Sequence, residues 1–227
     1  MPQQQHALIV GAGDGLSASL ARLLAREGFG LSLAARDTAK LAALCAETGA
    51  AAHACDAADA AQVAALFQAT PEAEVVVYNP SYRTRGPITD LDPEEVRRSL
   101  EVCAFGAFLV AQQAARRMLK AGRGTIVLTG ASAGVKGYPR SAPFAMGKFA
   151  LRGLAESMAR ELQPRNIHVA HFVIDGGVAA QGRPLRNDRP DSMLDPAAIA
   201  QTYMAVLKQP RSAWTFELAV RPWVERF

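Results

Sequence analysis

The chain has 227 residues, of which half are hydrophobic and 7% aromatic, and alanine is abundant. This length and composition suit one α/β domain over residues 1–227, and they argue against an all-β sandwich and against a fold that depends on disulfides. The 25 basic residues exceed the 21 acidic ones, but the two kinds are interspersed, so no nucleic-acid-binding stripe is indicated.

Short apolar runs alternate with longer segments of helical period along the chain, which is typical of parallel strands joined by crossover helices. We therefore expect a Rossmann-like three-layer sandwich, with a seven-stranded parallel sheet and helices on both faces. The expected strands are 6–10, 31–35, 51–55, 74–78, 125–129, 167–174 and 214–220.

The first expected strand leads into a glycine-rich turn, VGAGDGL, and then a helix. Glycines at such a turn let the backbone approach a pyrophosphate, which the free N–H groups and the dipole of a helix N-terminus favour. Taken alone this is a weak signal, because tight turns without a ligand use the same residue. The candidate phosphate-binding residues are Gly11, Gly13, Asp14, Gly15 and Leu16.

The turn resembles the Gly-x-x-x-Gly-x-Gly motif of the short-chain dehydrogenases/reductases, with Gly11 and Gly15 in place and Ser17 at the third glycine. Residues downstream extend the resemblance over most of the chain. It implies a nicotinamide dinucleotide cofactor and hydride transfer between that cofactor and a small carbonyl or alcohol substrate.

The end of the second expected strand bears on which cofactor is used. Ala35 stands where an acidic residue would grip the ribose hydroxyls of NAD, and Arg36 follows it. An arginine there can pair with a 2′-phosphate, so NADP is favoured over NAD. The alternative is that Arg36 is only a solvated surface charge.

Further cofactor contacts follow the third and fourth expected strands by resemblance. Asp56, with Ala57 beside it, matches the family's adenine-contacting aspartate, and Asn79 and Pro80 stand where the family has Asn-Asn-Ala-Gly. Only Asn79 matches in that second motif, so a different backbone path is expected there.

A long helix is expected from Pro93 to about Lys120, with Asp92 as its N-cap. Cys103 falls within it, at the position of the family's helix-bending asparagine, and is best interpreted as a small buried hydrophobe. The family pairs its subunits through this helix and the next one, which implies a dimer or tetramer.

The family's catalytic residues are asparagine, serine, tyrosine and lysine, with tyrosine as the general acid/base. Lys148 matches the lysine, but Phe144 occupies the tyrosine position four residues earlier. Ala131, thirteen residues before Phe144, occupies the serine position, and Cys103 the asparagine position. Three of the four positions thus lack their polar group at consistent spacing, so the usual acid/base site is absent.

Other hydroxyl groups could replace the missing acid. Tyr138, Ser132, Ser141 and Tyr82 lie in segments expected near the carboxyl ends of the strands. Enoyl reductases of this fold place their tyrosine seven residues before the lysine, and here that residue is Ser141.

The segment after the sixth expected strand should pass the nicotinamide. Asp175 and Gly176 replace the family's Pro-Gly residues there, and backbone contacts from Val178 to the carboxamide are expected by resemblance. Residues 179–192 are polar and rich in proline, glycine and arginine, so a mobile loop is expected, and 179–197 should read the substrate.

Other features exclude further classes. The three cysteines lack metal-binding or disulfide spacing, which fits a reducing cytoplasm. His168 and His171 are three apart on a strand and so point to opposite faces, and no metal site is expected. No basic leader region is present and no apolar run reaches the roughly 18 residues of a membrane span, so a soluble protein is expected.

Three functions remain open. The chain could be an NADP(H)-linked oxidoreductase with an unusual acid, or a cofactor-binding sensor or scaffold without catalysis. An S-adenosylmethionine methyltransferase is the weakest, because Ala35 and Arg36 replace the acidic residue such enzymes want and Lys148 would have no role.

Overall fold

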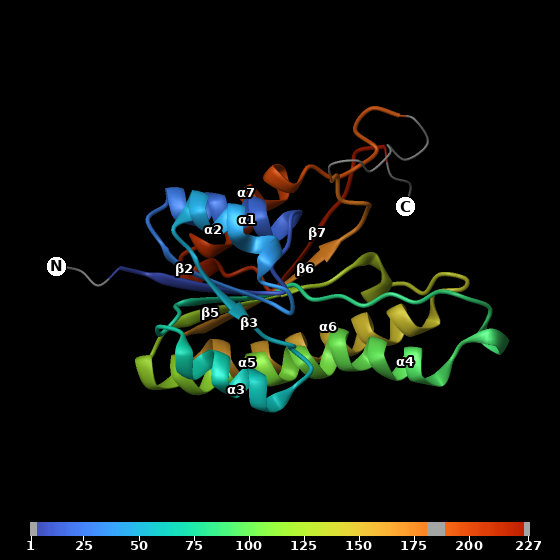
Figure 1. Ribbon diagram of the computed structural model, residues 1–227, viewed down its shortest axis with the longest axis horizontal. Helices are drawn as coiled ribbons and strands as arrows, with labels where there is room; N and C mark the ends of the chain where they lie inside the picture. The colour runs from blue at the N-terminus through green and yellow to red at the C-terminus, as the bar shows by residue number, and fades with distance from the viewer. Residues whose placement is uncertain (1–3, 181–188, 225–227) are drawn as a thin grey trace.

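The sheet of the computed structural model, which describes residues 4–180 and 189–224, has seven parallel strands in the order β3-β2-β1-β4-β5-β6-β7 (Figure 1). This confirms the expected fold class. The strands are β1 His6–Val10, β2 Gly30–Ala35, β3 Ala51–Ala54, β4 Val75–Tyr78, β5 Gly124–Thr129, β6 Ile167–Ile174 and β7 Glu217–Val220. Six of them agree with the sequence-based bounds to within one residue.

The seventh strand starts at Glu217 rather than at the expected residue 214. Trp214 and Thr215, which precede it, make side-chain contacts in place of strand pairing. The indole of Trp214 stacks on the His168 ring, with centroids 4.7 Å apart, and Nε2 of His168 lies 2.8 Å from the Thr215 carbonyl. The Thr215 amide donates to the side chain of Gln209.

Helices cover both faces of the sheet (Figure 1). One face carries α1 Leu16–Arg26, α2 Ala42–Thr48 and α7 Pro196–Leu207, and the other carries α3 Ala60–Ala69, α4 Pro93–Leu100, α5 Gly106–Ala121 and α6 Ala142–Leu162. The central strands are buried on both sides as a result: Ala7 and Ile9 of β1 belong to the core under α1, and Leu8 and Val10 to the core on the opposite face.

The expected long helix runs from Pro93 to Ala121, but with a π-helical turn, Glu101–Phe105, between α4 and α5. The turn is centred on Cys103, the position that the family's helix-bending asparagine would occupy. The hydroxyl of Tyr78, at the end of β4, donates to the Val102 carbonyl. Gly106 permits this close approach, because a Cβ there would lie 2.5 Å from the Tyr78 hydroxyl.

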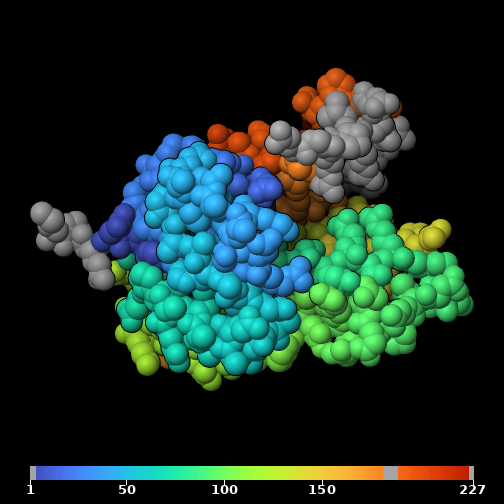
Figure 2. Space-filling model, viewed as in Figure 1, coloured from blue at the N-terminus to red at the C-terminus, as the bar shows by residue number. Residues whose placement is uncertain are grey.

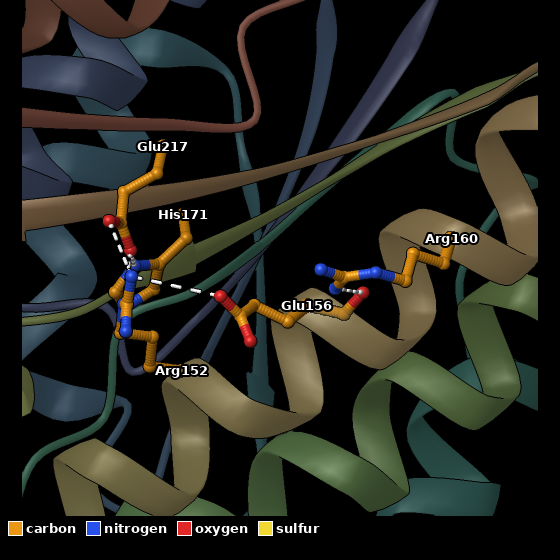
Figure 3. Close-up of polar contacts among 5 residues, drawn as sticks. All are labelled: Arg152, Glu156, Arg160, His171 and Glu217. Atoms are coloured by element: carbon orange, nitrogen blue, oxygen red, sulfur yellow. Dashed lines mark hydrogen bonds and ion pairs between the residues drawn. The ribbon is translucent and has the colours of Figure 1, made fainter.

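A charged network joins α6 to the last two strands (Figure 3). Nδ1 of His171 lies 2.9 Å from Oε2 of Glu217, and Nε of Arg152 donates to the same carboxylate at 2.7 Å. Arg152 also lies 3.7 Å from Glu156, whose backbone carbonyl accepts a hydrogen bond from Arg160. Glu217 of β7 is therefore joined to α6 through Arg152 and to β6 through the buried imidazole of His171.

Acidification should destabilise the folded protein, in part through the His171–Glu217 contact. Burial lowers the pKa of His171 in the folded protein, and it also lowers those of His6 and His168, so the unfolded chain takes up protons first as the pH falls below about 6.5. Arg152 lowers the pKa of Glu217, which adds a loss at lower pH. The free energy of unfolding in urea should therefore fall between pH 7 and pH 5, and less steeply in His171→Gln. Equal slopes in the two proteins would contradict this role of His171.

In the part of the chain that the structure describes, no helix is both long enough and apolar enough to cross a membrane. Within the same residues, no three histidine, cysteine or carboxylate side chains gather where they could hold a metal ion.

Candidate active site

The glycine turn lies between the end of β1 and α1. Gly11 has φ +80°, and its amide donates to the Ala34 carbonyl at 2.9 Å. At Gly13 and Gly15 an added Cβ would meet no atom within 4 Å, so the space in front of the turn is open. Gly15 is the N-cap of α1 and makes no side-chain capping bond, which leaves the first N–H groups of the helix available to an anion.

Ser17, at the position of the family's third glycine, has a role that the sequence did not indicate. Its hydroxyl donates to the Gly11 carbonyl at 3.2 Å and accepts from the side-chain amide of Asn79 at 2.8 Å. The Asn79 backbone amide donates to the Val10 carbonyl. The turn and the end of β4 are thus tied together by side chains. Leu16 is buried in the core and Asp14 is exposed.

Arg36 and Asp56 line one pocket of about 310 Å³. Its other wall is α4, and Figure 2 shows the blue and cyan surface of the N-terminal segments bordering the green surface that contains α4. The remaining lining residues are Ala58, Glu94, Glu95, Arg97, Arg98, Glu101 and Val102. Ala57, which follows Asp56, is buried, and its carbonyl faces Gly106.

The three altered catalytic positions come together in space. Cys103, Ala131 and Phe144 form one buried apolar cluster with Ala133, and the Phe144 side chain is only 3% exposed. Ser132 starts the short helix Ser132–Gly134 beside this cluster and is partly buried. The cluster itself contains no hydroxyl group.

Lys148 lies next to the cluster, on α6. It is 2% exposed, its ammonium donates to the Thr129 carbonyl at 2.9 Å, and Nζ is 5.9 Å from the centroid of the Phe144 ring. Burial lowers the pKa of Lys148, and the nearby charge of Arg83 lowers it further. An ammonium group has three N–H donors, so this bond to a carbonyl uses one of them.

The proposed substitute donors lie in different places. Tyr138 is 42% exposed in the segment before α6, and a hydrogen bond from Lys136 to Tyr138 raises the pKa of Lys136. The Tyr82 hydroxyl donates to Glu95 at 2.5 Å, which places it at the pocket of Arg36 rather than beside Lys148. Ser141 is buried at the start of α6.

The segment after β6 runs past the same edge of the sheet. The buried Asp175 carboxylate lies 3.5 Å from Arg221 and 3.9 Å from Lys136. A Cβ on Gly176 would lie 2.7 Å from Pro222, and Val178 pairs with Leu194 in an isolated parallel bridge. Of the expected substrate loop, 179–197, residues 181–188 lie outside the described residues.

Comparison with known proteins places this arrangement in one family. The family profile described as short chain dehydrogenase matches residues 5–187. A short-chain dehydrogenase structure from Rhodopseudomonas palustris is 36% identical, with a TM-score of 0.85 over 98% of this chain and 100% of the other. A metagenomic short-chain oxidoreductase solved with NADP is 27% identical, with a TM-score of 0.83 over 97% of this chain and 98% of the other.

Curated relatives agree. Trans-4-hydroxycyclohexanecarboxylate dehydrogenase of Sinomonas cyclohexanicum is 35% identical over 48% of this chain, although the match spans only 42% of that protein. D-threitol dehydrogenase of Mycolicibacterium smegmatis is 28% identical over 72% of this chain and 66% of its own length. From the fold and the match over most of its length, the chain belongs to the short-chain dehydrogenase family.

Proposed function

We propose that the protein is an NADP(H)-binding oxidoreductase that transfers hydride between the nicotinamide and a carbonyl or alcohol substrate, with a degenerate catalytic tetrad. The observation that carries this proposal is the pocket that joins Arg36 to Asp56 beside an open, uncapped glycine turn. Both lie at the carboxyl edge of a parallel sheet, where folds of this kind bind nucleotides.

The residues present fit a dinucleotide. The open space at Gly13 and Gly15 would admit the pyrophosphate, Asp56 would contact the adenine, and Arg36 a 2′-phosphate. Lys148 would donate to the nicotinamide ribose from its buried position. The bound nicotinamide supplies the hydride, whereas neither Phe144 nor Ala131 can hold or move a proton.

A non-catalytic sensor or scaffold is the second candidate, and one observation favours it. The positions where an acid and a substrate-orienting hydroxyl would be needed are filled by a buried apolar cluster, Cys103, Ala131, Ala133 and Phe144. Such packing stabilises the fold but supplies no group that could donate a proton or orient a substrate. The two functions differ in whether bound NADPH is ever consumed.

Arg36 should make the protein bind NADPH more tightly than NADH. Charge-assisted bonds to the 2′-phosphate should give a preference of about ten-fold or more, which fluorescence titration of both cofactors measures. Arg36→Ala should abolish the preference. Arg97→Ala is the matched control, since Arg97 lines the same pocket but is already paired with Glu94 and Glu101. Equal wild-type affinities, or no binding of either cofactor, would refute the proposal.

We also propose that the chain pairs with itself through α5 and α6. Phe105 and Phe108, whose rings stack 6.2 Å apart, are 50% and 41% exposed, and Met146 and Phe149 are 48% and 45% exposed. Exposed large apolar side chains that recur on two helices indicate a contact surface. Light scattering should give the mass of a dimer or tetramer, and Phe105→Asp should lower it. A wild-type mass of one chain would contradict this pairing.

A further inference from the structure

Arg98 reaches the pocket of Arg36 from the opposite wall. It lies on α4 and lines the same cavity of about 310 Å³ that Arg36 lines from the end of β2. The two residues are far apart in the sequence, and only the fold brings them to one pocket. A group bound in this pocket therefore lies between two guanidinium groups.

The carboxylates that α4 and the turn after it bring to this pocket have partners of their own. Arg97 is ion-paired with both Glu94 and Glu101. The hydroxyl of Tyr82 donates a hydrogen bond of 2.5 Å to Glu95. Each of these acidic side chains is therefore engaged by a neighbour other than Arg36 or Arg98.

Arg36 and Arg98 are the cations of this pocket that have no carboxylate partner. Within residues 4–180 and 189–224, neither guanidinium forms an ion pair or a hydrogen bond. Arg98 instead lies over the face of the Tyr82 ring, with its guanidinium carbon 5.0 Å from the ring centroid. Both arginines are exposed, so the N–H donors of both are available to a ligand in the pocket.

The ring under Arg98 is fixed because Tyr82 is bonded on several sides. Its amide lies 3.4 Å from Sγ of Cys103, its carbonyl accepts from the Ser99 hydroxyl at 3.2 Å, and its own hydroxyl donates to Glu95. These partners belong to α4 and to the π-helical turn that follows it. Tyr82 is thus held against the helix that carries Arg98, and the cation–π contact keeps the guanidinium at the pocket.

The two guanidinium groups act on the same point. The hydrogen bond to Glu95 raises the pKa of Tyr82, and the charges of Arg98 and Arg36 both act against that rise. Both arginines therefore lie near the Tyr82 hydroxyl. A phosphate dianion placed between them would receive charge-assisted bonds from two planar forks of N–H donors. Because the pocket is open to solvent, each contact alone is screened, and a strong preference for the dianion needs both.

We propose that Arg98 is a second determinant of cofactor choice: its guanidinium and that of Arg36 together bind the 2′-phosphate of NADP(H), one from each wall of the pocket. This rests on the proposed function, because it needs the adenosine end of the cofactor in this pocket. It adds a residue of α4, an element to which the sequence assigned no contact with a phosphate.

The test uses the adenosine half of the cofactor, which isolates this pocket from the nicotinamide. Adenosine 2′,5′-bisphosphate and 5′-AMP, which differ only in the 2′-phosphate, are titrated calorimetrically into the wild-type protein and its variants. The bisphosphate should bind about ten-fold or more tightly to the wild type. Arg98→Gln should lower that ratio about five-fold. Arg98→Lys should keep part of it, because the charge remains without the planar fork.

Two further variants define the effect. Arg85→Gln is the matched control, since it removes the same charge from an exposed arginine that follows Tyr82 in the chain but does not line the pocket, and it should leave the ratio unchanged. Arg98→Gln combined with Arg36→Ala should give the same ratio as Arg36→Ala alone, because the two guanidinium groups share one phosphate.

The outcomes separate the role of Arg98 from the function on which it rests. If the bisphosphate is preferred and Arg98→Gln keeps the full ratio, Arg98 takes no part and Arg36 alone selects the cofactor. An equal loss in Arg85→Gln would also refute the role of Arg98, since general positive charge would then be the cause. If 5′-AMP binds as tightly as the bisphosphate, the preference for NADP and the role of Arg98 are both refuted, while nucleotide binding stands. If neither nucleotide binds, the cofactor proposal itself fails, and the role of Arg98 fails with it.

Discussion

Replacing Phe144 with tyrosine should raise NADPH-dependent carbonyl reduction by about 10²- to 10⁴-fold, the usual contribution of a positioned general acid. The ring is already buried at the required position, and Lys148 lies 5.9 Å from its centroid. A hydroxyl added to this ring would sit near two cations, Lys148 and Arg83, which would lower its pKa towards the operating range.

The hydroxyl introduced by Phe144→Tyr should work better with a second hydroxyl beside it in the cluster. Ala131 is 8% exposed and belongs to the same buried group as Phe144, so the double variant with Ala131→Ser should exceed Phe144→Tyr alone. Phe149→Tyr is the matched control, since it adds the same hydroxyl to a residue of α6 that is 45% exposed. NADPH oxidation over a broad panel of aldehydes, ketones and oxo acids is the measurement. No gain from either variant would favour the non-catalytic role.

The contrast between Lys148 and Arg83 shows what the sequence could and could not predict about the site. Cys103, Phe144 and Lys148 lie on helical elements and Ala131 directly precedes one, and the resemblance of their spacing to the family's was enough to predict that the four share a site. Arg83 lies between β4 and α4, where no periodicity fixes the path of the chain. Arg83 lies over Phe144. The residue before it, Tyr82, is held by a hydrogen bond from the Ser99 hydroxyl to its carbonyl, and these two residues are 17 apart in the sequence, so only the fold brings them together.

The strand assignments show the same difference between features that follow from a local sequence pattern and features that depend on tertiary contacts. The runs that became β1 and β6 are mostly apolar and almost wholly buried because helices cover both of their faces, and their sequence-based bounds agree with the structure. The last strand is shorter than expected because Trp214 and Thr215 contact His168 and Gln209 instead of extending the ladder. The π-helical turn at Cys103 likewise has a tertiary partner, the Tyr78 hydroxyl, which Gly106 allows to approach.

Gly11→Ala should destabilise the whole protein, by about 2–5 kcal/mol, because left-handed strain and a backbone clash act together. Gly11 has φ +80°, and a Cβ would lie 2.6 Å from the backbone nitrogen of Pro80. Pro80 cannot easily move, because Asn79 before it is fixed by its backbone bond to Val10 and its side-chain bond to Ser17. Urea unfolding should show the loss directly, and NADPH binding should disappear with the turn.

Gly13→Ala separates the fold from the cofactor site at the same turn. No φ in the left-handed region and no atom within 4 Å opposes a Cβ there, so the free energy of unfolding should change by less than about 1 kcal/mol. The added methyl would project into the open space that a pyrophosphate needs, and NADPH affinity should fall while the fold persists.

If Gly13→Ala binds NADPH as tightly as wild type, that space is not the phosphate site. If Gly11→Ala is as stable as wild type, the turn is not held by Pro80. The two glycines thus test independently whether this turn serves packing or provides an opening for a ligand, a distinction that a count of glycines in the sequence cannot make.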